Sequence, residues 1–463
     1  MKPINLFGLG TQSRSPNVTA QKRINLYLEF TQDGDKTKVV AYGTPGRTEF
    51  ADRGANPLRG MHAFGLYIYI VQQGAFWRID SSGTAVNKGS IDTVQGRVSM
   101  ADKGTQIMIS TGTSGYIYNT STDVFVQITD ADYPGGDTVA FSDGFFIVNR
   151  PSTGQFWISA SYNGLLWDAL DFATAESNPD NLVSVIADHS QLILLGDVST
   201  EFWSNTGALD FPYSRITSVE WGLAARWSVA KFENSIIYLA KNRMGEVQIV
   251  KLNGYSPTIV DTSDISYLIN NYTTLSDASG LSYMLNGHPF YQINFPTAGE
   301  SWLYDGKSDC WSQLKSYDVT RDRAEIGVTY NNKTVVSDYA TGMMSNVDGD
   351  VYTDNGGQIV SELIGRHLVN GLDLFTISEL QVDLESGVGL ATGQGSDPQI
   401  MLQVSRDGGH NYGSEKWRSM GRVGQYRARA RWLRLGEGRD FTFRLRISDP
   451  VKRVLINAWM MGS

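Results

Sequence analysis

The side chains that most often bind metals or act in acid–base catalysis are few and widely spaced in this chain. It contains one cysteine, Cys310, and five histidines, at positions 62, 189, 288, 367 and 410. No histidine pair has the spacing of the His-Glu-x-x-His zinc motif. No phosphate-binding Gly-x-x-x-x-Gly-Lys-Ser/Thr loop occurs, and Gly8-Leu9-Gly10 lacks the third glycine of a dinucleotide fingerprint. We therefore expect no catalytic residue, no cofactor and no metal, and we expect each histidine to be structural.

One acidic segment has the oxygen-bearing side chains that a calcium ion prefers. Asn346, Asp348 and Asp350 alternate along the chain, and Asp354 follows them. The segment does not fit the EF-hand pattern, because Val351 stands where a glycine is needed. A plain hairpin turn built on Asx and Gly residues is the interpretation that we favour here.

A basic segment near the C-terminus stands out in an otherwise acidic chain. Residues 416–453 contain twelve Lys or Arg and three Asp or Glu, whereas the whole chain has a formal net charge of −9. Within it, Tyr426 to Gly436 alternates arginines with small or apolar residues, which predicts a strand with arginines on one face. Such a surface either meets an acidic partner, protein or nucleic acid, or is simply solvated.

Composition places the chain in the globular, strand-rich class. It has 463 residues, of which 41% are hydrophobic and 11% aromatic. A single cysteine excludes an intrachain disulfide and fits a reducing compartment. No apolar run approaches the length of a membrane-spanning helix, so we expect no membrane insertion. The acidic total argues against general affinity for nucleic acid.

A repeat of short strands predicts an all-β protein built on a β-propeller. Each unit has a strand that ends in a small polar residue, with an apolar residue six positions later, and the anchors are 39 to 52 residues apart. Propeller blades of four strands have this period. The anchors are Asp80, Asn119, Ser161, Asn205, Asn253, Asp305 and Asn346. They predict about seven blades, with six or eight as alternatives, or otherwise an irregular array of β-sandwiches.

The pattern changes near residue 358. Runs that alternate apolar and polar residues follow one another here, such as 377–384, 401–405 and 441–447, and they lack the polar anchor of the propeller units. This pattern predicts an antiparallel β-sandwich. We therefore divide the chain into an N-terminal extension with short strands (1–57), a β-propeller (58–357) and a C-terminal β-sandwich that forms a basic assembly domain (358–463).

One turn in the C-terminal domain is similar to the Asp-box of sialidase-type propellers. It comprises Ser405, Asp407, Gly408, Gly409 and Tyr412. In such turns the Asp side chain accepts backbone hydrogen bonds and the aromatic ring packs beneath, so we expect a structural role. A glycan-binding or glycan-hydrolysing propeller nevertheless stays open as an alternative function, as does a monomeric bacterial scaffold. A sialidase would need its arginines at the ring centre.

Both ends of the chain resemble the packaged-DNA stabilisation proteins of short-tailed bacteriophages. The resemblance rests on residues 15–21, 24–29 and 42–46 near the N-terminus, on 96–101 between two predicted blades, and on 405–413, 432–436 and 444–450 near the C-terminus. It implies a structural tail hub, or nozzle, made in the host bacterial cytoplasm and assembled into the virion tail. A ring of six copies would lie beneath the portal and its adaptor and retain the packaged DNA until ejection.

The resemblance also implies a set of partners. These are further copies of the chain, the portal-adaptor protein, a tailspike or tail fibre, and a tail needle or plug, while packaged DNA passes through the channel without sequence-specific binding. We expect the basic segment to meet protein, because arginine forks pair well with carboxylates at interfaces. The predicted assembly residues are Arg422, Arg427, Arg429, Arg431, Arg434, Arg439, Arg444 and Arg446.

Overall fold

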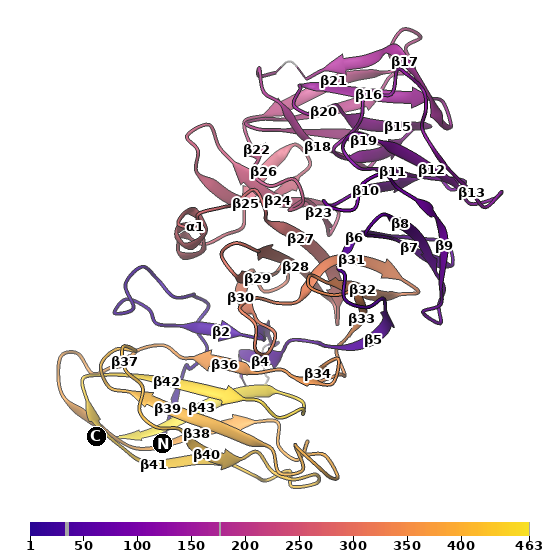
Figure 1. Cartoon of the computed structure of the whole chain (residues 1–463). Coiled ribbons are helices and arrows are strands. Elements are labelled where there is room, and N and C mark those ends of the chain that lie inside the picture. Colours follow the sequence, from indigo (N-terminus) through magenta and orange to yellow (C-terminus); the bar gives the residue numbers. More distant parts are fainter. Residues whose placement is uncertain (33–36, 176, 463) are drawn as a thin grey trace.

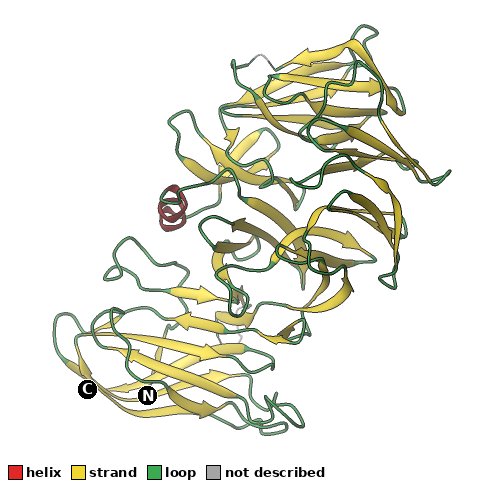
Figure 2. Cartoon of the chain, viewed as in Figure 1, coloured by secondary structure: helices red, strands yellow, loops and turns green. Residues whose placement is uncertain are grey.

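The computed structural model describes residues 1–32, 37–175 and 177–462 of the chain. Within this described part, strands dominate and the one α-helix is α1 (Ser263–Asn270). None of its helices is long and apolar enough to cross a membrane. Figures 1 and 2 show a large ring of small sheets joined to a second body that contains both chain termini.

In the described part of the chain the ring is a β-propeller of seven blades, and in most of them consecutive strands pair antiparallel. The first blade contains β6 (Leu58–Phe64), β7 (Tyr67–Gln72), β8 (Ala75–Ile79) and β9 (Ala85–Ser90), and the second contains β10 (Ser99–Asp102), β11 (Gln106–Ser110), β12 (Gly115–Asn119) and β13 (Val124–Gln127). The third contains β14 (Val139–Ser142), β15 (Phe145–Asn149), β16 (Gln155–Ala160) and β17 (Asn163–Thr174). The fourth contains β18 (Leu182–Asp188), β19 (Gln191–Gly196), β20 (Thr200–Asn205) and β21 (Tyr213–Val219).

The last three blades are less regular. The fifth contains β22 (Gly222–Leu223), β23 (Ala230–Phe232), β24 (Ser235–Lys241), β25 (Val247–Asn253) and β26 (Ser256–Ile259). The sixth contains β27 (Ser279–Leu285), β28 (His288–Phe295), β29 (Glu300–Asp305) and β30 (Cys310–Leu314). The seventh contains β31 (Ala324–Tyr330), β32 (Lys333–Asp338) and β33 (Met343–Asp348), and its first strand β31 contacts β6 of the first blade.

The small polar residue that anchors each predicted unit lies at the turn between the last two strands of the first six blades. In four of these turns the polar side chain of Asp80, Asn119, Asn205 or Asp305 accepts backbone N–H groups. Asp80 Oδ1, for example, accepts the backbone N–H of Ser82 and Thr84, at 2.9 and 3.0 Å. In some units the apolar residue six positions later packs on the preceding blade, as Phe125 does on Phe76, whereas Val86 and Ile259 are exposed. In the seventh blade the prediction is wrong, because the anchor Asn346 lies inside β33 and not at a turn.

The ring is closed by a strand from the N-terminal region. β5 (Gly46–Asp52) pairs antiparallel with β33 and so supplies the fourth strand of the seventh blade. The short strands β34 (Thr353–Asp354) and β35 (Gly357–Gln358) extend the same sheet. Arg47 of β5 binds Asp322 and Asp354 at 3.0 and 2.6 Å, so the closure combines a strand ladder with a largely buried ion-pair network.

The second body is a β-sandwich that includes N-terminal strands. One sheet has the order β3-β4-β43-β38-β41, with β1 paired to β43; its strands are β1 (Lys2–Ile4), β3 (Leu26–Phe30), β4 (Val39–Gly43), β38 (Phe375–Leu384), β41 (Ala430–Gly438) and β43 (Val454–Gly462). The facing sheet contains β2 (Lys22–Ile24), β36 (Ser361–Ile364), β37 (Leu368–Val369), β39 (Gln399–Ser405), β40 (Lys416–Ser419) and β42 (Asp440–Ile447).

One ladder joins the two bodies. β2 pairs with β30 of the sixth blade on one side and with β36 of the sandwich on the other, which makes a continuous sheet across the junction. The sandwich core takes Leu26, Leu28 and Ala41 from the N-terminal strands and Trp432 and Phe443 from the C-terminal ones. The all-β class, the propeller and the sandwich predicted from the sequence are thus confirmed.

Candidate assembly face and the Asp407 turn

The predicted arginine strand is shorter than its sequence pattern suggested. β41 begins at Ala430, so Arg427 and Arg429 lie in the preceding loop. That loop is folded into tight turns by the positive φ angles of Gly421 and Gly424, which the alternation of side chains does not reveal. From Ala430 to Leu433 the expected alternation holds, since Ala430 and Trp432 are buried while Arg431 and Leu433 are exposed.

The eight predicted arginines do not share one surface. Arg422, Arg427 and Arg429 lie in the loop before β41, Arg431 and Arg434 lie on β41, and Arg439 lies at the turn into β42. Arg444 and Arg446 lie on β42 in the other sheet, half-buried near the junction with the propeller. The structure therefore separates Arg444 and Arg446 from the arginines of the loop and of β41, and it places Arg439 at the opposite end of β41 from the loop.

Several of these arginines are already paired within the chain. Arg431 binds Glu379 on the neighbouring strand β38 at 2.6 Å. Arg444 and Arg446 share Glu362 of β36, at 2.5 and 3.2 Å. Arg422 lies 3.7 Å from Asp397, and Arg439 donates to the carbonyl of Leu372. These arginines stabilise the sandwich itself, so less of their charge is available to a partner.

Arg427, Arg429 and Arg434 are different, because none makes an ion pair or side-chain hydrogen bond with the described residues. All three are exposed. Arg434 has a φ of +58° and lies where the register between β38 and β41 shifts, so it occupies a β-bulge. Bulges re-aim side chains at sheet edges. The free guanidinium groups are thus held on a turn and a bulge at the edge of the sandwich.

Exposed apolar residues that sequence reasoning missed surround these arginines. Tyr426 and Trp417 are 76% and 53% exposed, and Val423 and Leu433 are exposed as well. The sheet edges meet here, since Trp432 Nε1 donates to the carbonyl of Lys416 at 2.8 Å. Tyr, Trp and Arg are the residues that dominate binding energy at protein interfaces. We call Trp417, Tyr426, Arg427, Arg429 and Arg434 the arginine face; the sequence signal for it was the aromatic residues among the arginines.

The Asp407 turn is held by side-chain hydrogen bonds to the backbone. Asp407 accepts from the Ser405 hydroxyl at 2.6 Å and from the backbone N–H of Asn411 at 3.0 Å. These bonds, with that from the Asn411 side chain, lower the pKa of Asp407 to about 2. Gly408 and Gly409 both have positive φ angles. Both carboxylate oxygens are therefore engaged within the turn.

Two histidines connect this turn to the N-terminal loop. His367 Nδ1 lies 2.8 Å from the carboxylate of Asp440, and its Nε2 lies 2.8 Å from the carbonyl oxygen of Pro16. His410 Nε2 lies 2.8 Å from Asn17 Oδ1. Residues near the two ends of the sequence thus form one polar cluster on the sandwich.

The acidic segment that could have held calcium has other contacts. Asp354 binds Arg47, and Asp348 Oδ1 accepts the backbone N–H of Asp350 at 2.9 Å. In the part of the chain that the structure describes, no three His, Cys, Asp or Glu side chains gather as a metal site would require.

Two of the solved structures that match this chain have low similarity to it. A chain of the mitotic checkpoint complex is 10% identical with a TM-score of 0.44, and the alignment covers 75% of this chain and 100% of that one. The Neurospora crassa Pan2 WD40 domain is 9% identical with a TM-score of 0.44, over 66% of this chain and 96% of that one. A search of curated proteins finds no match.

Family models, in contrast, match almost the whole chain. The β-propeller of bacteriophage P22 Gp10, a stabilisation protein, matches residues 3–352. The β-sandwich of the same protein matches residues 361–461. The first match begins well before the first blade, as does the chain segment that supplies β5. The chain therefore belongs to the family of the bacteriophage P22 Gp10 stabilisation protein.

Proposed function

We propose that this protein is a non-enzymatic structural component of a short phage tail, where several copies form the hub, or nozzle, below the portal and adaptor. The observation that carries the proposal is the family match across both domains. The proposed ring has six copies, binds the adaptor, carries spikes or fibres, and surrounds the channel through which packaged DNA leaves. A tail needle or plug would close that channel until ejection.

The arginine face supports the assembly role. It combines unpaired Arg427, Arg429 and Arg434 with exposed Trp417 and Tyr426 on the sandwich. Arginine pairs with carboxylates through two parallel hydrogen bonds, and the rest of this acidic chain offers carboxylates to a neighbouring copy. We therefore assign this face to the contact with an adjacent subunit or with the adaptor ring.

The net charge supports a channel that does not hold DNA tightly. Each chain has a formal net charge of −9, and duplex DNA is densely anionic. A ring of such chains with its arginines engaged at subunit contacts presents an acidic lumen, which repels the phosphates and lets the duplex slide.

Charge reversal tests the assembly role. The Arg427→Glu, Arg429→Glu double variant should fold normally, since neither side chain has a partner within the described chain, but should fail to join a ring on adaptor-bearing particles. The measurement is negative-stain imaging of particles after incubation with each purified protein. We expect ring occupancy to fall by about tenfold or more, because each desolvated charge pair contributes roughly 2 kcal/mol or more.

The matched control carries the same change of charge elsewhere. Arg150 and Arg243 are exposed on the propeller, and their replacement by glutamate should leave ring formation unchanged. Normal rings from the Arg427, Arg429 variant would refute the assignment of the arginine face. Salt-sensitive duplex DNA binding that is lost in that variant would instead assign the face to DNA.

A further inference from the structure

The segment Gly96 to Ala101, singled out by the sequence, places an arginine at the centre of the propeller. Arg97 lies in the connection between the first and second blades. Its guanidinium lies 4.9 Å from the ring centroid of Trp227 in the fifth blade and 3.8 Å from Glu325 in the seventh. A side chain that reaches both of these blades from the connection between the first and second blades must lie close to the axis.

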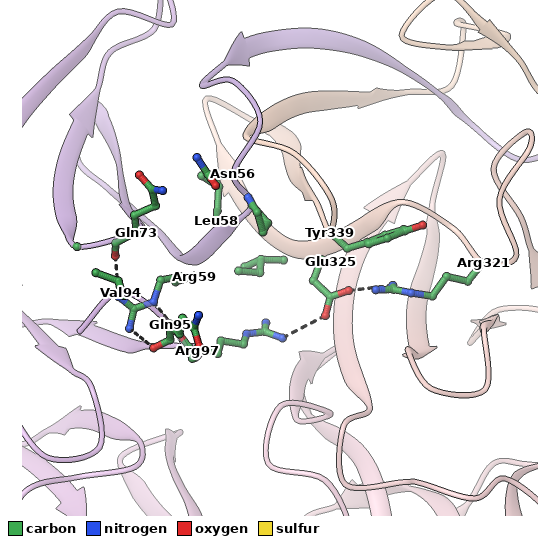
Figure 3. Close-up of a pocket in the computed structure, with 14 residues that line it drawn as sticks. Asn56, Leu58, Arg59, Gln73, Val94, Gln95, Arg97, Arg321, Glu325 and Tyr339 are labelled. Carbon is green, nitrogen blue, oxygen red and sulfur yellow. Dashed lines mark hydrogen bonds and ion pairs between the residues drawn. The ribbon is translucent and has the colours of Figure 1, made fainter.

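A cavity of about 840 Å³ opens beside Arg97, between the first and seventh blades (Figure 3). Its lining contains three arginines, Arg59, Arg97 and Arg321, but one carboxylate, Glu325. Leu58, Val94, Ile326 and Tyr339 supply apolar and aromatic walls. The cavity therefore combines an excess of positive charge with surface suited to an aliphatic or aromatic group.

Arg59 adds positive charge to the cavity lining and has no ion pair with a described carboxylate. It is buried, and its guanidinium donates to the carbonyl oxygens of Gln73, Thr93 and Gln95 at 2.6 to 2.7 Å. These bonds fix the loop that holds Arg97. Because burial outweighs the influence of nearby Asp92, the pKa of Arg59 is lower than its ordinary value.

Arg97 shares Glu325 with Arg321 and has the weaker contact with it. Glu325 is engaged by Arg321 at 2.9 Å, which itself stacks on Tyr339, and this leaves Arg97 with a contact of 3.8 Å. Charge-assisted hydrogen bonds are about 2.7–2.9 Å long. Arg226, which also reaches between blades, binds Asp137 at 2.6 Å. Burial lowers the pKa of Arg97, and Glu325 offsets this only in part.

We propose that this cavity binds an acidic peptide segment of a partner protein, with a carboxylate of that segment completing the fork of Arg97. A carboxylate matches the planar guanidinium, and Glu325 already makes the same kind of contact with Arg321 within the fold. The apolar wall suits the aliphatic stems of a peptide. Duplex DNA is too wide to enter a cavity of this size. The proposal is independent of ring formation.

Calorimetric titration of the full chain with hexaglutamate tests this site. The wild type should bind the peptide, and Arg97→Gln should weaken binding by about tenfold or more, because a hydrogen-bonded charge contributes roughly 1.5–3 kcal/mol. Arg97→Lys keeps the charge but not the fork, and should bind more weakly than the wild type. Near-ultraviolet circular dichroism of each variant verifies that its fold is intact.

Two controls separate the outcomes. Arg150→Gln makes the same change of charge outside the cavity and should leave hexaglutamate binding unchanged. Inorganic phosphate and oligothymidylate should bind no better to the wild type than to Arg97→Gln. Absence of hexaglutamate binding, equal binding by folded Arg97→Gln and wild type, or Arg97-dependent binding of phosphate or oligothymidylate would each overturn the proposal.

Discussion

At the scale of single residues, Asp407 shows how one side chain stabilises a backbone turn through hydrogen bonds. Its carboxylate accepts hydrogen bonds from Ser405 and Asn411, and these hold its pKa near 2. Asp407→Asn removes the charge that strengthens those bonds. We expect it to lower the free energy of unfolding by about 1 kcal/mol at neutral pH, a modest value because the carboxylate is largely exposed.

The pH dependence gives this prediction a second readout. Since the folded-state pKa of Asp407 is lower than the ordinary value of 3.8, its stabilisation is full only above about pH 5 and is lost as the pH falls through 3.8 toward 2. The difference in unfolding free energy between wild type and Asp407→Asn, measured by urea titration, should therefore shrink between pH 5 and pH 3. A difference that is constant over this range would contradict the assigned hydrogen bonds.

Also at the residue scale, the arginines show what a sequence pattern can and cannot predict. The alternation around Trp432 correctly places Arg431 on the outer face of a strand, because that periodicity is local. Its partner Glu379 is 52 positions earlier in the sequence, and the pairing depends on the register of β38 against β41. The sequence alone therefore did not separate paired Arg431 from unpaired Arg427.

At the scale of elements, β5 holds the propeller ring closed. Arg47 is the central residue, since it binds Asp322, Asp354 and the hydroxyl of Ser316. Although burial favours the neutral form of Asp322, the charge of Arg47 and hydrogen bonds keep the pKa of that carboxyl below its ordinary value. Arg47→Met should lower the free energy of unfolding by about 3 kcal/mol or more, because it leaves two carboxylates without their cation.

An exposed ion pair provides the control for Arg47. Arg243 binds Glu220 at 3.0 Å on the propeller surface, where both side chains are more than half exposed. Arg243→Met should change the free energy of unfolding by less than about 1 kcal/mol. The measurement is chemical denaturation followed by tryptophan fluorescence. Equal effects of the two substitutions would show that Arg47 does not stabilise the closure.

The same element marks the limit of prediction from sequence. The turns at Asp80 and Asn205 were predictable because an Asx side chain bonds backbone groups within a few residues of itself. The pairing of β5 with β33 joins segments almost three hundred positions apart, and nothing in the local pattern of either strand specifies the other. For that reason residues 1–57 were expected to form an extension, and their pairing partners could not be foreseen.

At the scale of the whole molecule, the N-terminal region connects the two domains. β1, β3 and β4 complete one sheet of the sandwich, β2 bridges its other sheet to the sixth blade, and β5 closes the ring. A force applied to the sandwich is therefore transmitted to the propeller through hydrogen-bonded strands.

This architecture predicts that the C-terminal sandwich does not fold alone. A fragment of residues 358–463 lacks β1, β3 and β4, and it lacks the core residues Leu6, Phe7, Leu26 and Leu28. Each buried Leu or Phe contributes roughly 1.5–3 kcal/mol to stability. The net stability of a domain is usually about 5–15 kcal/mol. The combined loss of the four side chains therefore exceeds the lower end of that range.

We therefore expect the isolated fragment to lack near-ultraviolet circular dichroism and a cooperative thermal transition. Joining residues 1–45 to it through a flexible Gly/Ser linker should restore both, because β1 and β4 can then pair with β43, and β3 with β4. The same linked fragment with Leu26→Asp and Leu28→Asp should again fail to fold, since buried unpaired carboxylates oppose docking. A cooperative transition in the unlinked fragment would show that the sandwich is stable without its N-terminal strands.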